Sequence, residues 1–222
     1  MTAGRGASSS FILEESGPGG RPGAGGGADE DFDPGFGRLG IEHWAEAGIV
    51  GRGVLVDLPQ YCTTIQRDYD PFSGEAVGPD LIRDALEAQG SVFRPGDVLC
   101  INFGWAAEYF GLPEDEQPLS AGRKTFAGLA GSEEVAEFLW NSRVAALVCD
   151  NPAIEVSPGD PSVGSLHRRA IPLLGLAFGE LFDLRRLAQV CRDRGRWDFL
   201  FVSVPVNVPG AIGSPGNAVA VV

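Results

Sequence analysis

The stretch "PGDVLCINFGW", residues 95–105, decides the fold class of this chain. Its first residues predict a turn, and the apolar run that follows is typical of a buried strand. Directly before it, "GPDLIRDALEAQG" (78–90) has the apolar spacing of a helix, with Pro79 in the first turn and Gly90 at the end. A helix that leads into a buried strand is the unit from which α/β proteins are built.

The same alternation continues on both sides of this stretch. Ser132 and Asp183 are the expected N-caps of two further helices. The pattern predicts an α/β fold with a mixed β-sheet and flanking helices. Helices are expected in "LGIEHWAEAG" (39–48), "GSEEVAEFLWNSR" (131–143) and "DLRRLAQVCRDRG" (183–195), and strands in "GVLVDL" (53–58), "VAALVCD" (144–150), "WDFLFVSVPV" (197–206) and "NAVAVV" (217–222).

Composition restricts the classes of function. The chain of 222 residues has 30 acidic and 17 basic side chains, a net charge of -13, which argues against a nucleic-acid groove. No apolar run approaches the roughly 20 residues of a membrane-spanning helix, and no signal peptide is evident, so we expect a cytoplasmic protein. The four cysteines are widely spaced and are expected to be reduced, buried thiols rather than zinc ligands or disulfides.

The first 37 residues differ from the rest of the chain. The segment "GPGGRPGAGGG" (17–27) has seven glycines in eleven residues and cannot bury enough apolar surface to offset its ordering entropy. We therefore expect a disordered Gly/Pro-rich tail over residues 1–37 and one globular domain over residues 38–222.

The stretch "LHRRAIPLLGLAFGE" (166–180) contains His167, one of two histidines in the chain, and ends at Glu180. One interpretation is an ordinary helix with a histidine in its first turn and a surface glutamate after it. The other is that both side chains converge on a metal ion. A helix from His167 followed by a reversal near Gly175 would bring Glu180 back beside the imidazole.

Four other residues are worth weighing. Trp105 follows a strand end, where it is either core or the wall of a substrate pocket, and Asp150 ends a strand as either a turn former or a pocket group. Both are candidate substrate-binding residues. Arg52, between two glycines, is expected to form a structural ion pair, and His43 to be an ordinary helix histidine. The glycine-rich "GAIGSPGN" (210–217) lacks the lysine and the strand–loop–helix context of a phosphate-binding loop.

Six blocks in order give the chain a family resemblance over residues 39–222. Together they resemble the putative cyclase family of metal-dependent hydrolases, which includes bacterial kynurenine formamidase and isatin hydrolase. The blocks are "GIVGRGVLVDL" (48–58), "RPGDVLCINFGW" (94–105), "AGLAGSEEVAEFLW" (127–140), "VAALVCDNPAIE" (144–155), "LHRRAIPLLGLAFGELFDLRRLA" (166–188) and "GAIGSPGNAVAVV" (210–222).

The resemblance implies a kynurenine formamidase-like fold of the swivelling β/β/α type, usually dimeric. It also implies hydrolysis of an amide, formamide or lactam with zinc or manganese, as in the arylformamidase step of tryptophan catabolism. His167 and Glu180 match the family's later pair of metal ligands and are the candidate catalytic and metal-binding residues. The implied partners are a small amide or lactam substrate and a second copy of the chain, with no nucleic acid or membrane.

The chain departs from the family pattern at one motif. The family's His-x-Gly-Thr-His-x-Asp metal motif is absent, and the low-complexity tail stands where that segment belongs. The expectation is therefore an N-terminally truncated member that retains two metal ligands, short of the three protein ligands of a catalytic zinc site, and that binds metal weakly or has lost it. Three hypotheses remain open: a metal-dependent C–N hydrolase, a catalytically impaired member acting as an interaction module, and a small-molecule binding domain.

Overall fold

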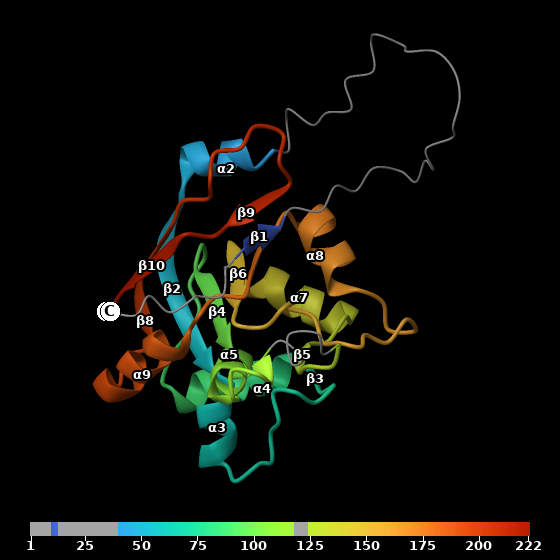
Figure 1. Cartoon of the computed structure of the whole chain (residues 1–222), viewed down its shortest axis with the longest axis vertical. Helices are drawn as coiled ribbons and strands as arrows, with labels where there is room; N and C mark the ends of the chain where they lie inside the picture. Colours follow the sequence, from blue (N-terminus) through green and yellow to red (C-terminus); the bar gives the residue numbers. More distant parts are fainter. Residues whose placement is uncertain (1–9, 13–39, 118–123) are drawn as a thin grey trace.

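The structure is a computed structural model that describes residues 10–12, 40–117 and 124–222. Over these residues the main sheet has eight strands in the order β10-β8-β2-β4-β6-β7-β1-β9, and β3 and β5 form a second, two-stranded sheet (Figure 1). The central strands β2, β4, β6 and β7 are parallel, whereas β8 is antiparallel to β2 and β10 is antiparallel to β8. The predicted α/β fold with a mixed sheet is confirmed.

The helices and strands expected from the sequence occur in the expected order, and the structure adds short elements that the pattern did not predict, among them helices over 58–64 and 105–111. Ser132 caps α7 by accepting a hydrogen bond from the Val135 backbone N–H at 3.3 Å, as expected. Strands are β1 (Ser10–Ile12), β2 (Ile49–Asp57), β3 (Ala76–Val77), β4 (Val98–Asn102), β5 (Gly128–Leu129), β6 (Ala146–Cys149), β7 (Ala177–Glu180), β8 (Asp198–Ser203), β9 (Gly213–Pro215) and β10 (Ala218–Val221). Helices are α2 (Ile41–Ala47), α3 (Leu58–Thr64), α4 (Pro79–Ala88), α5 (Trp105–Gly111), α7 (Glu133–Ser142), α8 (Leu166–Leu174) and α9 (Arg185–Arg194).

Helices cover both faces of the parallel strands. Val54 and Val56 of β2 lie in a core shared with α4, α7 and α8, whereas Leu55 lies in a second core shared with α9. Figure 1 shows α7 and α8 on one side of the sheet and α9 on the other. Burial on both faces explains why these strands are continuous apolar runs rather than alternating ones.

Part of the expected N-terminal tail pairs with the sheet. Ser10–Ile12 form β1, which is antiparallel to β7 and β9. A strand was not expected within residues 1–37, and the rest of that segment lies outside the described residues. All four cysteines are free and buried, as predicted. Within the described residues, no helix is long and apolar enough to cross a membrane.

Candidate functional site

The connection from β6 through α8 to β7 brings His167 and Glu180 together. His167 lies in the first turn of α8, and the helix ends at Gly175, whose φ of 70° is the left-handed conformation that glycine adopts without steric cost. The chain then returns as β7, parallel to β6, and Glu180 is its last residue. His167 Nε2 is 3.1 Å from Glu180 Oε1. The predicted proximity is confirmed, and the alternative of a surface glutamate is wrong, because Glu180 is 3% exposed.

A third side chain, Glu155, completes a Glu–His–Glu cluster. Its Oε2 is 2.8 Å from His167 Nδ1, so each ring nitrogen of His167 faces one carboxylate. The same Oε2 accepts a hydrogen bond from the His167 backbone N–H at 3.2 Å and one from Ser165 Oγ at 3.0 Å. Glu180 Oε1 also accepts from the Ile154 backbone N–H at 2.8 Å. Both carboxylates are therefore fixed by backbone contacts as well as by the ring.

Glu155 was not among the residues predicted for the site, although it ends the block "VAALVCDNPAIE" (144–155). Glu155 lies in a loop, where it pairs with Leu129 through an isolated β-bridge. Its position beside His167 depends on this long-range contact with β5. A single glutamate at the end of an apolar stretch does not belong to any helix or strand periodicity. The local sequence pattern therefore could not distinguish Glu155 from a surface glutamate.

The two carboxylates of the cluster change the pKa of the imidazole between them. Burial opposes a charge on the His167 ring, but hydrogen bonds to Glu155 and Glu180 outweigh that cost and raise the pKa of His167 to about 9. For Glu155, burial acts to raise the pKa, yet hydrogen bonds from His167 and from backbone N–H groups bring it below its usual value. The ring therefore holds a proton more tightly than a free imidazole does, and a metal ion that binds Nε2 must displace that proton.

Two ligand positions fit a divalent ion. The 3.1 Å between His167 Nε2 and Glu180 Oε1 matches the spacing of two donors that each lie about 2.1 Å from one ion. Glu155, on the opposite ring nitrogen, is placed as the carboxylate that orients a ligating histidine. Within the described part of the chain, no group of three or more His, Cys, Asp or Glu side chains could hold a metal ion. The described residues thus supply two ligands.

A shallow hollow of about 370 Å³ lies beside the cluster, with Glu155, His167 and Phe126 in its wall. Behind Phe126, Trp105 is 4% exposed and stacks on Tyr109 with ring centroids 4.8 Å apart. Trp105 therefore belongs to a packed aromatic cluster next to the hollow. Its predicted contact with substrate stays a prediction.

Asp150 is buried in the corner between β4 and α5. Its two carboxylate oxygens accept hydrogen bonds from the backbone N–H groups of Phe103 at 2.7 Å and Ala106 at 3.0 Å. Burial raises the pKa of Asp150 to about 6, although these backbone hydrogen bonds act to lower it. The carboxylate thus anchors the start of the helix that carries Trp105, and a role in substrate binding stays a prediction.

The two other residues considered in the sequence, Arg52 and His43, lie away from the cluster. Arg52 Nη2 lies 2.6 Å from Asp97 Oδ2, which confirms the expected ion pair. His43 lies exposed on α2. Neither residue is among those that line the hollow beside His167.

Comparison with known proteins identifies the family. A family model described as putative cyclase matches residues 29–156, more than half of the chain. The chain belongs to the putative cyclase family. The matched range ends one residue after Glu155, so the pair His167 and Glu180 lies beyond it. No curated protein sequence matches the chain.

Solved structures confirm the cyclase fold. The crystal structure of a novel cyclase is 30% identical with a TM-score of 0.69, and the match covers 83% of this chain but 57% of that one. Isatin hydrolase A from Labrenzia aggregata, bound to benzyl benzoate, is 14% identical with a TM-score of 0.59 and coverages of 96% and 72%. A potential metal-dependent hydrolase with cyclase activity is 16% identical with a TM-score of 0.52 and coverages of 96% and 77%. The chain spans little more than half the length of the first of these structures.

Proposed function

We propose that this cyclase-family chain is a metal-dependent hydrolase of a C–N bond in a small amide, formamide or lactam. The observation that carries the proposal is the pair His167 and Glu180, 3.1 Å apart and partly buried, with Glu155 on the far side of the ring. Histidine with a carboxylate suits zinc or manganese. The similar structures described as isatin hydrolase and as a potential metal-dependent hydrolase support the same class of reaction.

The residues of the chain would bind and orient in this reaction. A bound divalent ion would polarise the substrate carbonyl and lower the pKa of a water molecule toward about 7. His167 and Glu180 would hold that ion, and Glu155 would keep Nδ1 of the ring occupied so that Nε2 is the ligating atom. The hollow bounded by Phe126 would receive the substrate. Water adds across the C–N bond to give a carboxylic acid and an amine.

The alternative function is a catalytically impaired member that acts as a binding or interaction module. The observation in its favour is the ligand count, because the described residues bring two ligands to the cluster and catalytic zinc sites have three. Under this alternative the Glu–His–Glu cluster is retained as a structural ion triad. The two functions differ in whether added metal produces turnover.

A hydrolysis assay tests the proposal. The chain is incubated with an arylformamide or with isatin, with and without Mn²⁺ or Zn²⁺, beside His167→Ala, Glu180→Gln and the control His43→Ala. We expect slow hydrolysis that requires metal, disappears in the first two variants and persists in the control. Metal-independent turnover, or equal turnover in His167→Ala and His43→Ala, would refute the proposed function. Absence of turnover in the wild type with metal bound would favour the binding module.

A further inference from the structure

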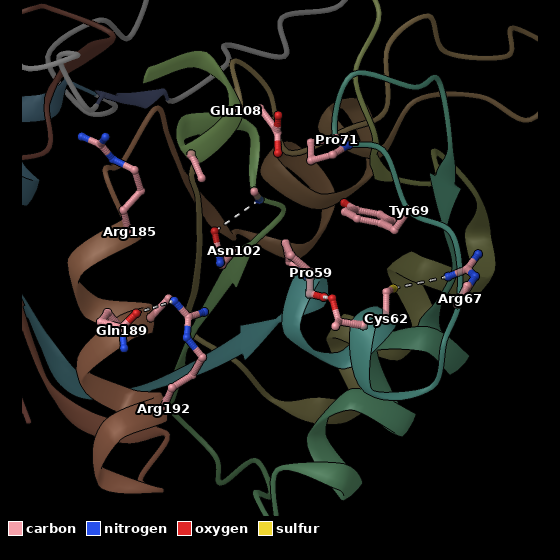
Figure 2. Close-up of a pocket in the computed structure, with 14 residues that line it drawn as sticks. Pro59, Cys62, Arg67, Tyr69, Pro71, Asn102, Glu108, Arg185, Gln189 and Arg192 are labelled. Carbon is pink, nitrogen blue, oxygen red and sulfur yellow. Dashed lines mark hydrogen bonds between the residues drawn. The ribbon is translucent and has the colours of Figure 1, made fainter. Parts of the chain in front are cut away.

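A second cavity, of about 570 Å³, opens at the carboxyl ends of β2 and β4 between α3, α5 and α9 (Figure 2). In open α/β sheets this is the edge where ligands bind. Its volume lies within the roughly 300–1,000 Å³ typical of small-molecule pockets. Among the described residues, none lines both this cavity and the hollow beside His167. The cavity is therefore a separate candidate site.

Arg192 of α9 is a fixed cation in this cavity. Its Nη1 donates to Asp57 Oδ2 at 2.5 Å, and its Nη2 donates to Gln189 Oε1 at 3.3 Å. Asp57 is buried, and its other oxygen accepts a hydrogen bond from Asn102 Nδ2 at 2.8 Å. Figure 2 shows the guanidinium group reaching between Gln189 and Asn102. The ion pair holds Arg192 in place before any ligand arrives, which reduces the entropy cost of binding.

The cavity wall is rich in arginine, although the chain is strongly acidic. Three arginines line it, Arg67, Arg185 and Arg192, against one acidic residue, Glu108, whereas the whole chain has 30 acidic and 17 basic residues. Arg67 and Arg185 lie at the two sides of the cavity (Figure 2), and each is held by an acid outside the wall. Each of these arginines is already paired with a carboxylate, Arg192 with Asp57, so the wall offers a ligand guanidinium N–H donors rather than a net positive charge.

Part of the wall is apolar and rigid. Gly104 has a φ of 88°, and a Cβ there would lie 2.7 Å from Pro59 Cγ and 3.2 Å from Pro71 Cγ. Two proline rings therefore pack directly on the glycine backbone at the end of β4. Ala107 and Ala188 add small apolar side chains from α5 and α9. A ligand here meets a preformed apolar surface opposite the guanidinium group of Arg192.

We propose that this cavity binds a small organic carboxylate, with its carboxylate group on Arg192 and its apolar body against Pro59, Pro71 and Ala107. A guanidinium group matches the planar geometry of a carboxylate. An inorganic anion would contact the arginine but would leave the apolar wall unused. The site is independent of the proposed hydrolytic centre and does not require metal.

Ligand-observed NMR on the full chain, freed of metal on a chelating resin, tests this site. The probe is phenylacetate, compared with its uncharged isostere phenylacetamide and with inorganic phosphate. We expect saturable binding of phenylacetate alone. Arg192→Lys retains the positive charge beside Asp57 but loses the planar pair of guanidinium donors, so it should weaken phenylacetate binding about tenfold. Arg194→Lys is the control: Arg194 lies on the same helix but outside the cavity wall, and its substitution should leave binding unchanged.

Two further variants keep the outcome decisive. Ala107→Phe fills the cavity without altering Arg192 and should abolish binding even if Arg192→Lys fails to fold. His167→Ala should bind phenylacetate like the wild type, which separates this site from the hydrolytic centre. The proposal is overturned if phenylacetate does not bind the wild type, or if phenylacetamide or phosphate binds equally well. It is also overturned if Ala107→Phe has no effect, or if His167→Ala abolishes binding.

Discussion

At the scale of single residues, the imidazole of His167 is held by two carboxylates of different origin. Glu180 arrives on the adjacent strand β7, and Glu155 arrives on a loop that pairs with β5. The sequence allowed the first contact to be predicted, because a helix that ends at a glycine and returns as a strand brings its two ends together. The second depends on a contact between distant segments, which local pattern does not contain.

The raised pKa of His167 predicts a pH-dependent contribution to stability. Its folded-state pKa of about 9 lies above the 6.5 of a free imidazole, so the stabilisation is complete below about pH 6.5 and is lost as pH rises through about 9. The upper bound is about 3.5 kcal/mol, since one pKa unit corresponds to about 1.4 kcal/mol. Urea unfolding of the wild type and His167→Gln at pH 6 and pH 10 measures it. An equal gap between the two proteins at both pH values would contradict the prediction.

Glu155→Gln tests the orienting role of this carboxylate. A glutamine retains a hydrogen-bonding oxygen for the ring but removes the negative charge, so we expect metal affinity to fall about 10- to 100-fold. Isothermal titration with Zn²⁺ measures the affinity, and the His167 tautomer can be followed by its ¹⁵N shifts. Glu134→Gln, an exposed site on α7, is the matched control. Equal Zn²⁺ affinities of Glu155→Gln and Glu134→Gln would show that Glu155 plays no part in metal binding.

At the scale of elements, the predicted helices and central strands are present, whereas the helices α3 and α5 were not predicted. Apolar periodicity and residues that begin or end a helix, such as Ser132 and Gly175, act through neighbours in the sequence. Tertiary contacts therefore do not change the element that they predict. The start of α9 differs by one position. Leu184, rather than Asp183, is its N-cap residue, and the Asp183 carboxylate binds the Arg185 side chain and backbone N–H instead. A neighbouring guanidinium competes with the capping role, which a residue preference alone does not register.

Asp150 gives a prediction about the corner between β4 and α5. Asp150→Ala leaves the buried N–H groups of Phe103 and Ala106 without acceptors, and we expect a loss of about 2 kcal/mol in the free energy of unfolding. Urea denaturation measures this loss. Asp160→Ala is the control, because Asp160 also accepts a backbone hydrogen bond but is exposed, and it should cost less than about 1 kcal/mol. Equal costs would show that Asp150 does not anchor the corner.

At the scale of the whole molecule, one face of the sheet carries an exposed apolar patch. We define it by Val50, Leu200, Val219 and Val221, which are 65%, 48%, 60% and 58% exposed. The register aligns them across β2, β8 and β10, with Val50 and Val219 both paired to Val202 and with Val221 paired to Leu200. Contiguous exposed apolar surface of this kind marks an interaction site, and an isologous dimer would cover it with its own copy.

The patch predicts a homodimer in solution. Light scattering during size-exclusion chromatography should give twice the chain mass for the wild type. Val219→Glu places a charge in the patch and should shift the protein toward monomer, whereas Val92→Glu, at a valine 68% exposed outside the patch, should not. A monomeric wild type, or the same dimer in both variants, would show that the patch is not the interface.

The order of six sequence blocks was enough to predict the family and its fold. The same blocks did not predict which side chains meet at the metal site. The blocks correspond to strands and helices of the core, where burial on both faces of the sheet restricts which residue types are tolerated. The metal site depends on which side chains meet from distant loops. Anomalous diffraction from crystals soaked in Mn²⁺ tests the central claim most directly. The account predicts a peak about 2.0–2.3 Å from both His167 Nε2 and a carboxylate oxygen of Glu180. A fully ordered crystal with no peak there, or with its strongest peak at other residues, would contradict it.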